Sequence, residues 1–137
     1  MMIEIITIDH IVLRTSKLDK MLNFYCQVLG CKIERKIPEV GLTQLRAGNA
    51  LIDLVDVDSE LGKLGGGPPS KKENNLDHFC LQLRAVSPEC LKQYLAGFDI
   101  ELGQFENRYG AQGFGPSLYI KDPEGNIIEL KSQMTSK

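Results

Sequence analysis

The chain contains two histidines, and each follows an aspartate at the start of an apolar, strand-like run. The first run is TIDHIVLRT, with His10, and the second is NLDHFCLQL, with His78. The two runs are about half of the 137-residue chain apart. Imidazole is both a common metal ligand and a common acid–base group, so a histidine position that occurs twice is a candidate for chemistry.

Each half of the chain also has an acid between branched aliphatic residues, Asp53 in LIDLV and Glu129 in NIIELK. Because strand side chains alternate between two faces, each histidine and each acid lies on the face opposite to its apolar neighbours. A buried carboxylate without a partner is costly. Imidazole and carboxylate ligands together suit Zn, Ni, Co, Mn or Fe(II). The pattern favours one divalent metal bound by both histidines and both acids.

The alternative is that each histidine is a hydrogen-bonded, half-buried strand residue and each acid lies on a solvated strand face. The matched placement in both halves favours the metal site. The aspartates that precede the histidines, Asp9 and Asp77, are expected to point to the opposite strand faces. They are therefore not expected to orient the imidazoles directly.

Composition limits the classes of function. A net charge of −2 and a pI near 5.7 give no electrostatic case for binding nucleic acid or an anionic membrane. No apolar stretch reaches transmembrane length, and the N-terminus lacks the features of a signal peptide. The four cysteines show no C-x-x-C spacing and fall in apolar patterns, which predicts reduced core or near-core residues in a cytoplasmic protein.

The elements that must position these residues occur twice in the same order. The first half predicts a helix from an N-cap at Ser16 to a stop at Gly30, and strands at 5–15, 31–37, 42–48 and 51–57. The second half predicts a helix with Ser87 as N-cap, and strands at 76–83, 100–105, 116–122 and 126–132. Residues 58–75, rich in glycine, proline and charge, form a linker between module one (1–57) and module two (76–137). The prediction is one α+β domain of two βαβββ modules.

Taken together, these motifs resemble the vicinal oxygen chelate superfamily, which includes glyoxalase I, fosfomycin-resistance enzymes, extradiol dioxygenases and bleomycin-binding proteins. The segments SLYIKDPEGNIIEL and DHIVLRTSKLDKMLNFYCQVLG carry the resemblance, which extends over essentially the whole chain. It implies a curved, open mixed sheet with a central cleft and helices on the outer face, usually completed by a homodimer. It also implies that His10, Asp53, His78 and Glu129 occupy the four metal-ligand positions of glyoxalase I, with Asp53 in place of a glutamate.

The resemblance assigns substrate binding to further residues. Arg14 matches an arginine that holds the glutathione carboxylate in glyoxalase I. Ser117 and Tyr119 match positions near the phosphonate in fosfomycin enzymes, and Arg108 belongs to the same segment, NRYGAQGFGPSLYI. With a bulged turn at the DPEG sequence, Tyr119 would lie opposite Glu129. The alternatives are a solvent-exposed strand charge for Arg14 and strand packing for Ser117 and Tyr119.

The chemistry that the resemblance implies is bidentate coordination of two vicinal substrate oxygens by one divalent metal acting as a Lewis acid. Glu129 is then the expected general base. The favoured activity is a lyase or isomerase of lactoylglutathione-lyase type. The alternatives are a fosfomycin-type epoxide-opening enzyme, an extradiol dioxygenase, methylmalonyl-CoA epimerisation, and a metal-free module that binds a drug or another small ligand.

Overall fold

The structure, a computed structural model, describes residues 2–134 and divides into two compact units, Met1–Ser70 (unit 1) and Lys71–Lys137 (unit 2). Each unit contains one four-stranded mixed sheet, in the order β1-β4-β3-β2 in unit 1 and β5-β8-β7-β6 in unit 2. The predicted α+β fold of two βαβββ modules is therefore confirmed. The outermost ends of the predicted modules, residues 1 and 135–137, lie outside the described residues.

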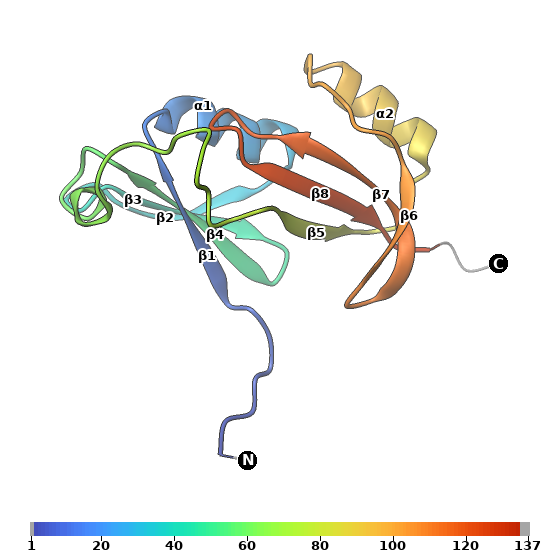
Figure 1. The fold of residues 1–137 in the computed structure, drawn as a ribbon, viewed down its shortest axis with the longest axis horizontal. Helices are drawn as coiled ribbons and strands as arrows, with labels where there is room; N and C mark the ends of the chain where they lie inside the picture. The colour runs from blue at the N-terminus through green and yellow to red at the C-terminus, as the bar shows by residue number, and fades with distance from the viewer. Residues whose placement is uncertain (1, 135–137) are drawn as a thin grey trace. The chain divides into compact units, whose positions relative to one another are not determined.

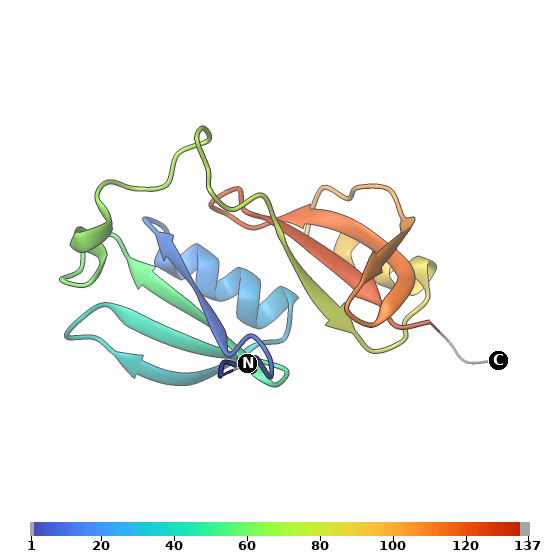
Figure 2. The ribbon, with the colours of Figure 1, turned by 60° about the horizontal axis from the view of Figure 1, so that its bottom comes forward.

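The ribbon views show the elements of both units (Figures 1 and 2). Unit 1 contains β1 His10–Thr15, α1 Leu18–Asn23, the π-helical turn η1 Phe24–Val28, β2 Lys32–Ile37, β3 Leu42–Ala47, β4 Ala50–Asp56 and the 3-10 turn η2 Gly62–Gly65. Unit 2 contains β5 Phe79–Leu83, α2 Pro88–Ala96, β6 Glu106–Gly110, β7 Gly113–Lys121 and β8 Ile127–Ser132.

In unit 1 the first strand, β1, pairs in parallel with the last, β4. This pairing places the strand that carries His10 beside the strand that carries Asp53. Leu13 of β1 is paired with Leu54 of β4, and Leu45 of β3 is paired with Ile52. These four side chains are buried and share one face of the sheet. Met21, Phe24, Tyr25 and Val28 of the helical segment are also buried, and burying each large apolar side chain stabilises the fold by about 1.5–3 kcal/mol.

Unit 2 repeats this arrangement. The first strand, β5, pairs in parallel with the last, β8, and β7 pairs with β8 in antiparallel fashion. Leu118, Ile120, Ile128 and Leu130 are almost completely buried on one face, while Leu91 and Leu95 are the buried residues of α2. Ser87 caps that helix by accepting a hydrogen bond from the backbone N–H of Cys90 at 3.2 Å, as predicted.

The predicted strand at 5–15 is wrong in its first half, because β1 begins only at His10. The residue paired with His10 is Leu51, and β4 begins one residue earlier, at Ala50. Residues 5–8 would have to pair with residues before Ala50, but there the chain forms the hairpin turn between β3 and β4 and does not continue β4. Residues 2–9 are exposed, and their isoleucines have exposed fractions of 71–96%.

Two further expectations differ from the structure. The N-cap of α1 is Lys17 rather than Ser16, and the Thr15 hydroxyl accepts a hydrogen bond from the Lys17 N–H at 2.8 Å. The predicted strand at 100–105 is also wrong, since the strand of that module is β6, Glu106–Gly110. A tight hairpin pairs Gly110 with Gly113, so the residues immediately before the turn, and not residues 100–105, form the ladder with β7.

The cysteines are all free thiols, as expected, but only some are in the core. Cys31 is buried and Cys26 is half-buried, whereas Cys80 and Cys90 are exposed. Burial raises the pKa of the Cys31 thiol to about 11. Within the part of the chain that the structure describes, no helix has the length and apolar character needed to cross a membrane.

Candidate functional site

The first donor pair, His10 and Asp53, lies on the face of the unit 1 sheet opposite to the buried leucines. Asp53 is paired with Val12, two residues after His10 on the same face of β1. The carboxylate is only 3% exposed, and its charge contributes to raising the pKa of His10. Gln44, opposite Asp53 on β3, donates a hydrogen bond from Nε2 to Asp53 Oδ2 at 3.1 Å.

The other carboxylate oxygen of Asp53, Oδ1, is buried and has no hydrogen-bond partner. A buried anionic oxygen in this state is costly, because water has been removed and nothing has replaced it. A cation bound at this oxygen would remove the cost. The donor set of His10 and Asp53 therefore fits a divalent metal.

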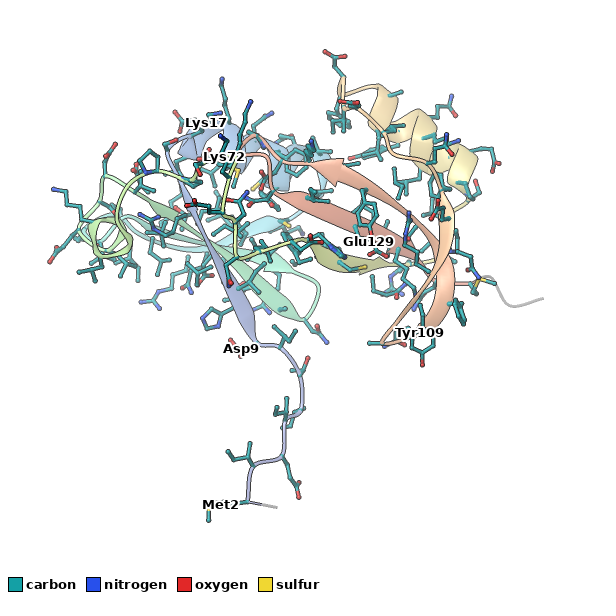
Figure 3. The ribbon with its side chains drawn as sticks, viewed as in Figure 1. Met2, Asp9, Lys17, Lys72, Tyr109 and Glu129 are labelled. Carbon is teal, nitrogen blue, oxygen red and sulfur yellow. The ribbon has the colours of Figure 1, made fainter. Side chains whose placement is uncertain are left out.

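The second donor pair, His78 and Glu129, is in direct contact. His78 Nε2 lies 3.3 Å from Glu129 Oε1. Glu129, a residue of β8 that Figure 3 labels, is only 6% exposed. Tyr119 is paired with Glu129 across the β7–β8 ladder, as predicted from the DPEG turn. The rings of His78 and Tyr119 meet edge to face, with their centroids 5.2 Å apart.

The aspartates that precede the histidines orient the imidazoles directly, contrary to the sequence-based expectation. Asp9 Oδ1 lies 2.6 Å from His10 Nδ1, and Asp77 Oδ2 lies 2.6 Å from His78 Nδ1. The expectation assumed strand alternation, but Asp9 precedes the first residue of β1, and both Asp77 and His78 precede β5. Residues outside a strand are free to place neighbouring side chains on the same side.

This contact determines which ring nitrogen is available. A carboxylate only accepts hydrogen bonds, so Nδ1 of each histidine carries the proton and donates it. In the neutral ring, Nε2 then has a free lone pair, the arrangement found in metal-ligating histidines whose other nitrogen is bonded to a carboxylate. The hydrogen bond with Asp9 is also the main cause that raises the pKa of His10 above its usual value.

The separation of the second donor pair matches the spacing of two ligands of one ion. Two atoms that each lie about 2.1 Å from a metal are about 3.0–3.4 Å apart at bond angles of about 90–109°. The observed 3.3 Å between His78 Nε2 and Glu129 Oε1 falls in this range. Without a metal, a proton between the two atoms would hold them together as an ion pair.

Two groups next to Glu129, the Tyr119 hydroxyl and the Cys80 thiol, keep their protons. Burial, followed by the charge of Glu129, raises the pKa of the Tyr119 hydroxyl above its usual value. Although the Cys80 residue as a whole is exposed, partial desolvation of its thiol raises the pKa to about 11, with a smaller contribution from the charge of Glu129, its partner in the β5–β8 ladder. Both groups therefore keep their protons at neutral pH.

Three of the four predicted substrate-binding residues lie together beside the second donor pair. Arg108 Nη1 donates to the backbone oxygen and to the hydroxyl of Ser117, each at 2.8 Å. The Arg108 guanidinium also lies over the Tyr119 ring, with its carbon 4.5 Å from the ring centroid. Glu106 accepts from Arg108 Nη2 at 3.1 Å and balances its charge.

Arg14, the fourth predicted substrate-binding residue, is engaged with the chain itself. Its Nη2 donates to the backbone oxygens of Gly62 and Gly66 at 2.9 and 2.7 Å, and its Nη1 donates to Gly67 at 3.0 Å. Its Nε is buried without a partner. A Cβ on Gly65 would overlap the guanidinium, so the glycine makes this contact sterically possible. The side chain anchors the segment that follows β4, and its contact with substrate stays a prediction.

Each unit thus holds two of the four predicted metal ligands. Among residues 2–134, no group of three or more histidine, cysteine, aspartate or glutamate side chains is arranged to hold a metal ion. The sequence reasoning missed Gln44 and Cys80. The register of the AGNA hairpin, in which Ala47 is paired with Ala50, would have placed Gln44 opposite Asp53.

Comparison with known proteins identifies relatives over most of the chain. Residues 7–130 match the model of the Glyoxalase/Bleomycin resistance protein/Dioxygenase superfamily. Virulence protein STM3117 of Salmonella typhimurium is 32% identical over 128 residues, which cover 90% of this chain and 81% of the relative.

Solved structures share the same fold. An integron cassette protein from the mobile metagenome of V. cholerae superposes with a TM-score of 0.74 at 24% identity, covering 98% of this chain and 100% of that chain. Lactoylglutathione lyase from Agrobacterium tumefaciens superposes with a TM-score of 0.66 at 22% identity, covering 92% of each chain. At these identities, the likeness concerns the fold alone.

Proposed function

Because the chain belongs to the Glyoxalase/Bleomycin resistance protein/Dioxygenase superfamily, whose members often bind divalent metals, we propose that it is a metal-dependent enzyme acting on a small substrate. The proposed reaction class is that of a lyase or isomerase of lactoylglutathione-lyase type. The substrate carries two vicinal oxygens and binds through both of them.

The proposed metal ligands are His10, Asp53, His78 and Glu129. In this proposal, one chain or the two chains of a homodimer supply them to one ion. The ion is Zn, Ni, Co, Mn or Fe(II), which all accept imidazole and carboxylate ligands. When bound, it would act as a Lewis acid on the substrate oxygens.

Glu129 is the proposed general base. Its Oε1 takes a proton from the carbon next to a substrate carbonyl and returns it to the neighbouring carbon. Burial of Glu129 beside the neutral Tyr119 excludes water from this proton and strengthens the electrostatic interactions of the carboxylate. Asp9 and Asp77 hold the two imidazoles in the tautomer with a proton on Nδ1.

A single observation supports this proposal most strongly. His78 Nε2 faces Glu129 Oε1 at 3.3 Å, while His78 Nδ1 is already bonded to Asp77 at 2.6 Å. Two groups that both accept a cation face each other at the spacing of two ligands of one metal. The buried, unpartnered Asp53 Oδ1 in unit 1 is a second place where a cation would be stabilised.

The metal content of protein purified without a chelator tests the proposal. We expect about one divalent ion per site by elemental mass spectrometry, lost in His78→Ala and in Glu129→Gln. Glu89→Gln is the matched control, because Glu89 is an exposed acid in the first turn of α2. Absence of bound metal from the wild-type protein, even after incubation with each of the five ions, would refute a metal-dependent enzyme.

The metal-loaded protein is then assayed with a hemithioacetal, an epoxide such as fosfomycin, and a catechol. Turnover of the hemithioacetal supports the lyase or isomerase. Turnover of the epoxide or of the catechol identifies one of the alternative activities instead. The same samples, run by size-exclusion chromatography with light scattering, test the proposed homodimer.

A second candidate function is metal-free binding of a small ligand. It is favoured by the same contact, because a protonated His78 between Asp77 and Glu129 is a satisfied ion pair without any metal. This candidate predicts that a chelator leaves both the thermal stability and ligand binding unchanged. The enzyme proposal predicts that the chelator lowers both.

A further inference from the structure

Lys131 is a buried cation on the same sheet face as the second donor pair. It lies on β8 two residues after Glu129 and is only 2% exposed. Its partners in the ladders are Gln82 on β5 and Ser117 on β7. Lysine is almost never buried in proteins unless its charge is paired, so this position calls for an explanation.

The ammonium group of Lys131 is poorly satisfied by the protein. Its one hydrogen bond is to Gln82 Oε1, at the long distance of 3.4 Å. In the described part of the chain, no acidic side chain lies within ion-pair distance of it. An ammonium group has three N–H donors, and the cost of burying an unpaired ion is several kcal/mol.

The corresponding region of unit 1 shows how the protein satisfies a cation when it does so internally. Arg14 occupies the position opposite Val55, just as Gln82 lies opposite Lys131 in unit 2. Three backbone oxygens of residues 62–67 accept hydrogen bonds from Arg14. Of the described residues of unit 2, only the Gln82 side chain supplies an oxygen to Lys131.

Two glycines, Gly110 and Gly115, lie close to the end of the Lys131 side chain. A Cβ on Gly110 would lie 3.5–3.8 Å from the end of the lysine, and a Cβ on Gly115 would lie 3.4 Å from its Nζ. A Cβ on Gly115 would also overlap the backbone oxygen of Ser132, so glycine is needed where the chain passes this close to the ammonium group. Ser117, opposite Lys131, is completely buried and its hydroxyl is bonded to Arg108.

We infer that Lys131 binds the acid group of an anionic small molecule, a carboxylate or a phosphate-type oxyanion, with Gln82 and Ser117 beside it. This inference rests on the proposed function for its location, since it names the substrate class of the same sheet face. The oxyanion supplies the charge and the acceptors that the ammonium group lacks. A substrate with an acid group in addition to its two vicinal oxygens fits this arrangement.

The test uses inorganic phosphate and acetate as probes on protein stripped of metal with EDTA, at constant ionic strength maintained with sodium chloride. We expect phosphate or acetate to raise the melting temperature, with saturation in the millimolar range. Lys131→Met is expected to weaken this binding at least about tenfold. Lys121→Met, at an exposed lysine on the neighbouring strand β7, is the matched control and is expected to bind like the wild type.

A second measurement locates the binding in case Lys131→Met is poorly folded. In nuclear magnetic resonance spectra of the wild-type protein, phosphate or acetate should shift the side-chain amide of Gln82 and the backbone amides of Ser117 and Lys131. The inference is overturned if neither anion protects the wild type, if protection is equal in Lys131→Met, or if the shifted signals lie elsewhere.

The two proposals fail in distinguishable ways. Lys131→Met should lose anion binding but retain the metal, whereas His78→Ala should lose the metal but retain anion binding. If the wild-type protein binds no metal but is stabilised by phosphate or acetate, only the metal-dependent enzyme is refuted. Bound metal without anion protection refutes only the role of Lys131.

Discussion

The two units carry the same donor types at matching positions but satisfy them differently. In unit 2, Glu129 reaches His78 at 3.3 Å. In unit 1, Asp53 makes no ion pair with His10, receives one hydrogen bond from Gln44, and leaves Oδ1 buried without a partner. The aspartate is one methylene shorter than the glutamate. The two side chains of the second pair are therefore already in contact, whereas the first pair contains a buried carboxylate oxygen that nothing in the protein satisfies.

For the basic side chains Arg14 and Lys131 the contrast is reversed, because here the residue of unit 1 is well satisfied and the residue of unit 2 is not. Arg14 of unit 1 is held by three backbone oxygens, whereas Lys131 of unit 2 has one long hydrogen bond. In unit 1 the position matching Lys131 is Val55, a buried aliphatic residue. Arg14 therefore anchors the segment that follows β4, whereas Lys131 has little internal support and is the residue that we propose for anion binding.

The largest expected effect separates the two acids. Glu129→Gln should weaken metal binding at least about a hundredfold, because it removes the charge from the preorganised pair. Asp53→Asn should weaken it about tenfold, and should leave the stability of the metal-free protein unchanged or higher, since a buried unpaired charge is removed. Titration of metal-stripped protein by calorimetry measures both. Equal losses would show that the two pairs contribute alike to metal binding, which would contradict the expected difference between them.

The next effect contrasts the two cations. Arg14→Met should destabilise the protein by about 2 kcal/mol, because it leaves three partly exposed carbonyl oxygens without their charged donor. Lys131→Met should be neutral or stabilising, because an unpaired buried ion is replaced by an apolar group of similar length. Urea denaturation measures both changes. A loss of stability in Lys131→Met as large as in Arg14→Met would show that the lysine is structural.

A smaller effect concerns the aspartates that orient the histidines. Asp77→Asn and Asp9→Asn should each weaken metal binding about tenfold, since the tautomer and ring orientation of the imidazole are no longer held by a carboxylate. Asp99→Asn, at a position after α2 and away from both donor pairs in sequence, serves as a control for the substitution itself. Metal affinities unchanged from wild type in both histidine-adjacent variants would assign these contacts a merely local role.

The smallest effect is the titration of His10 in the metal-free protein. Its pKa is raised above 6.5, first by the hydrogen bond with Asp9 and further by the charge of Asp53. A raised pKa stabilises the fold below the pKa of the unfolded chain, and this contribution is lost as pH rises through the folded value. It is small because the ring is exposed. Nuclear magnetic resonance titration of the ring protons should show this pKa fall in Asp9→Asn.

Local patterns in the sequence were reliable where a single element decides the structure. Ser87 and Pro88 set the start of α2, and the DPEG turn set Tyr119 opposite Glu129. Apolar patterns failed where a neighbouring strand decides. The isoleucines of residues 2–9 favour a strand, but β4 begins too late to pair with them. Residues 100–105 also look like a strand, but the Gly110–Gly113 hairpin gives the ladder to residues 106–110.

Strand periodicity and turn chemistry act between residues close in the chain, so the residue pattern was enough to predict the repeated βαβββ order correctly. The same pattern proposed the four metal ligands, which stay a prediction. The hydrogen-bond and ion-pair partners of these side chains, in contrast, could be found from the three-dimensional structure alone. Three such features depend on where the end of a side chain lies in space. They are the contacts of Asp9 and Asp77 with the imidazoles, the unpartnered oxygen of Asp53, and the single long hydrogen bond of Lys131. The surroundings of Asp53 and Lys131 arise from strand register between segments far apart in the chain, whereas the Asp9 and Asp77 contacts arise because these two residues lie just outside their strands.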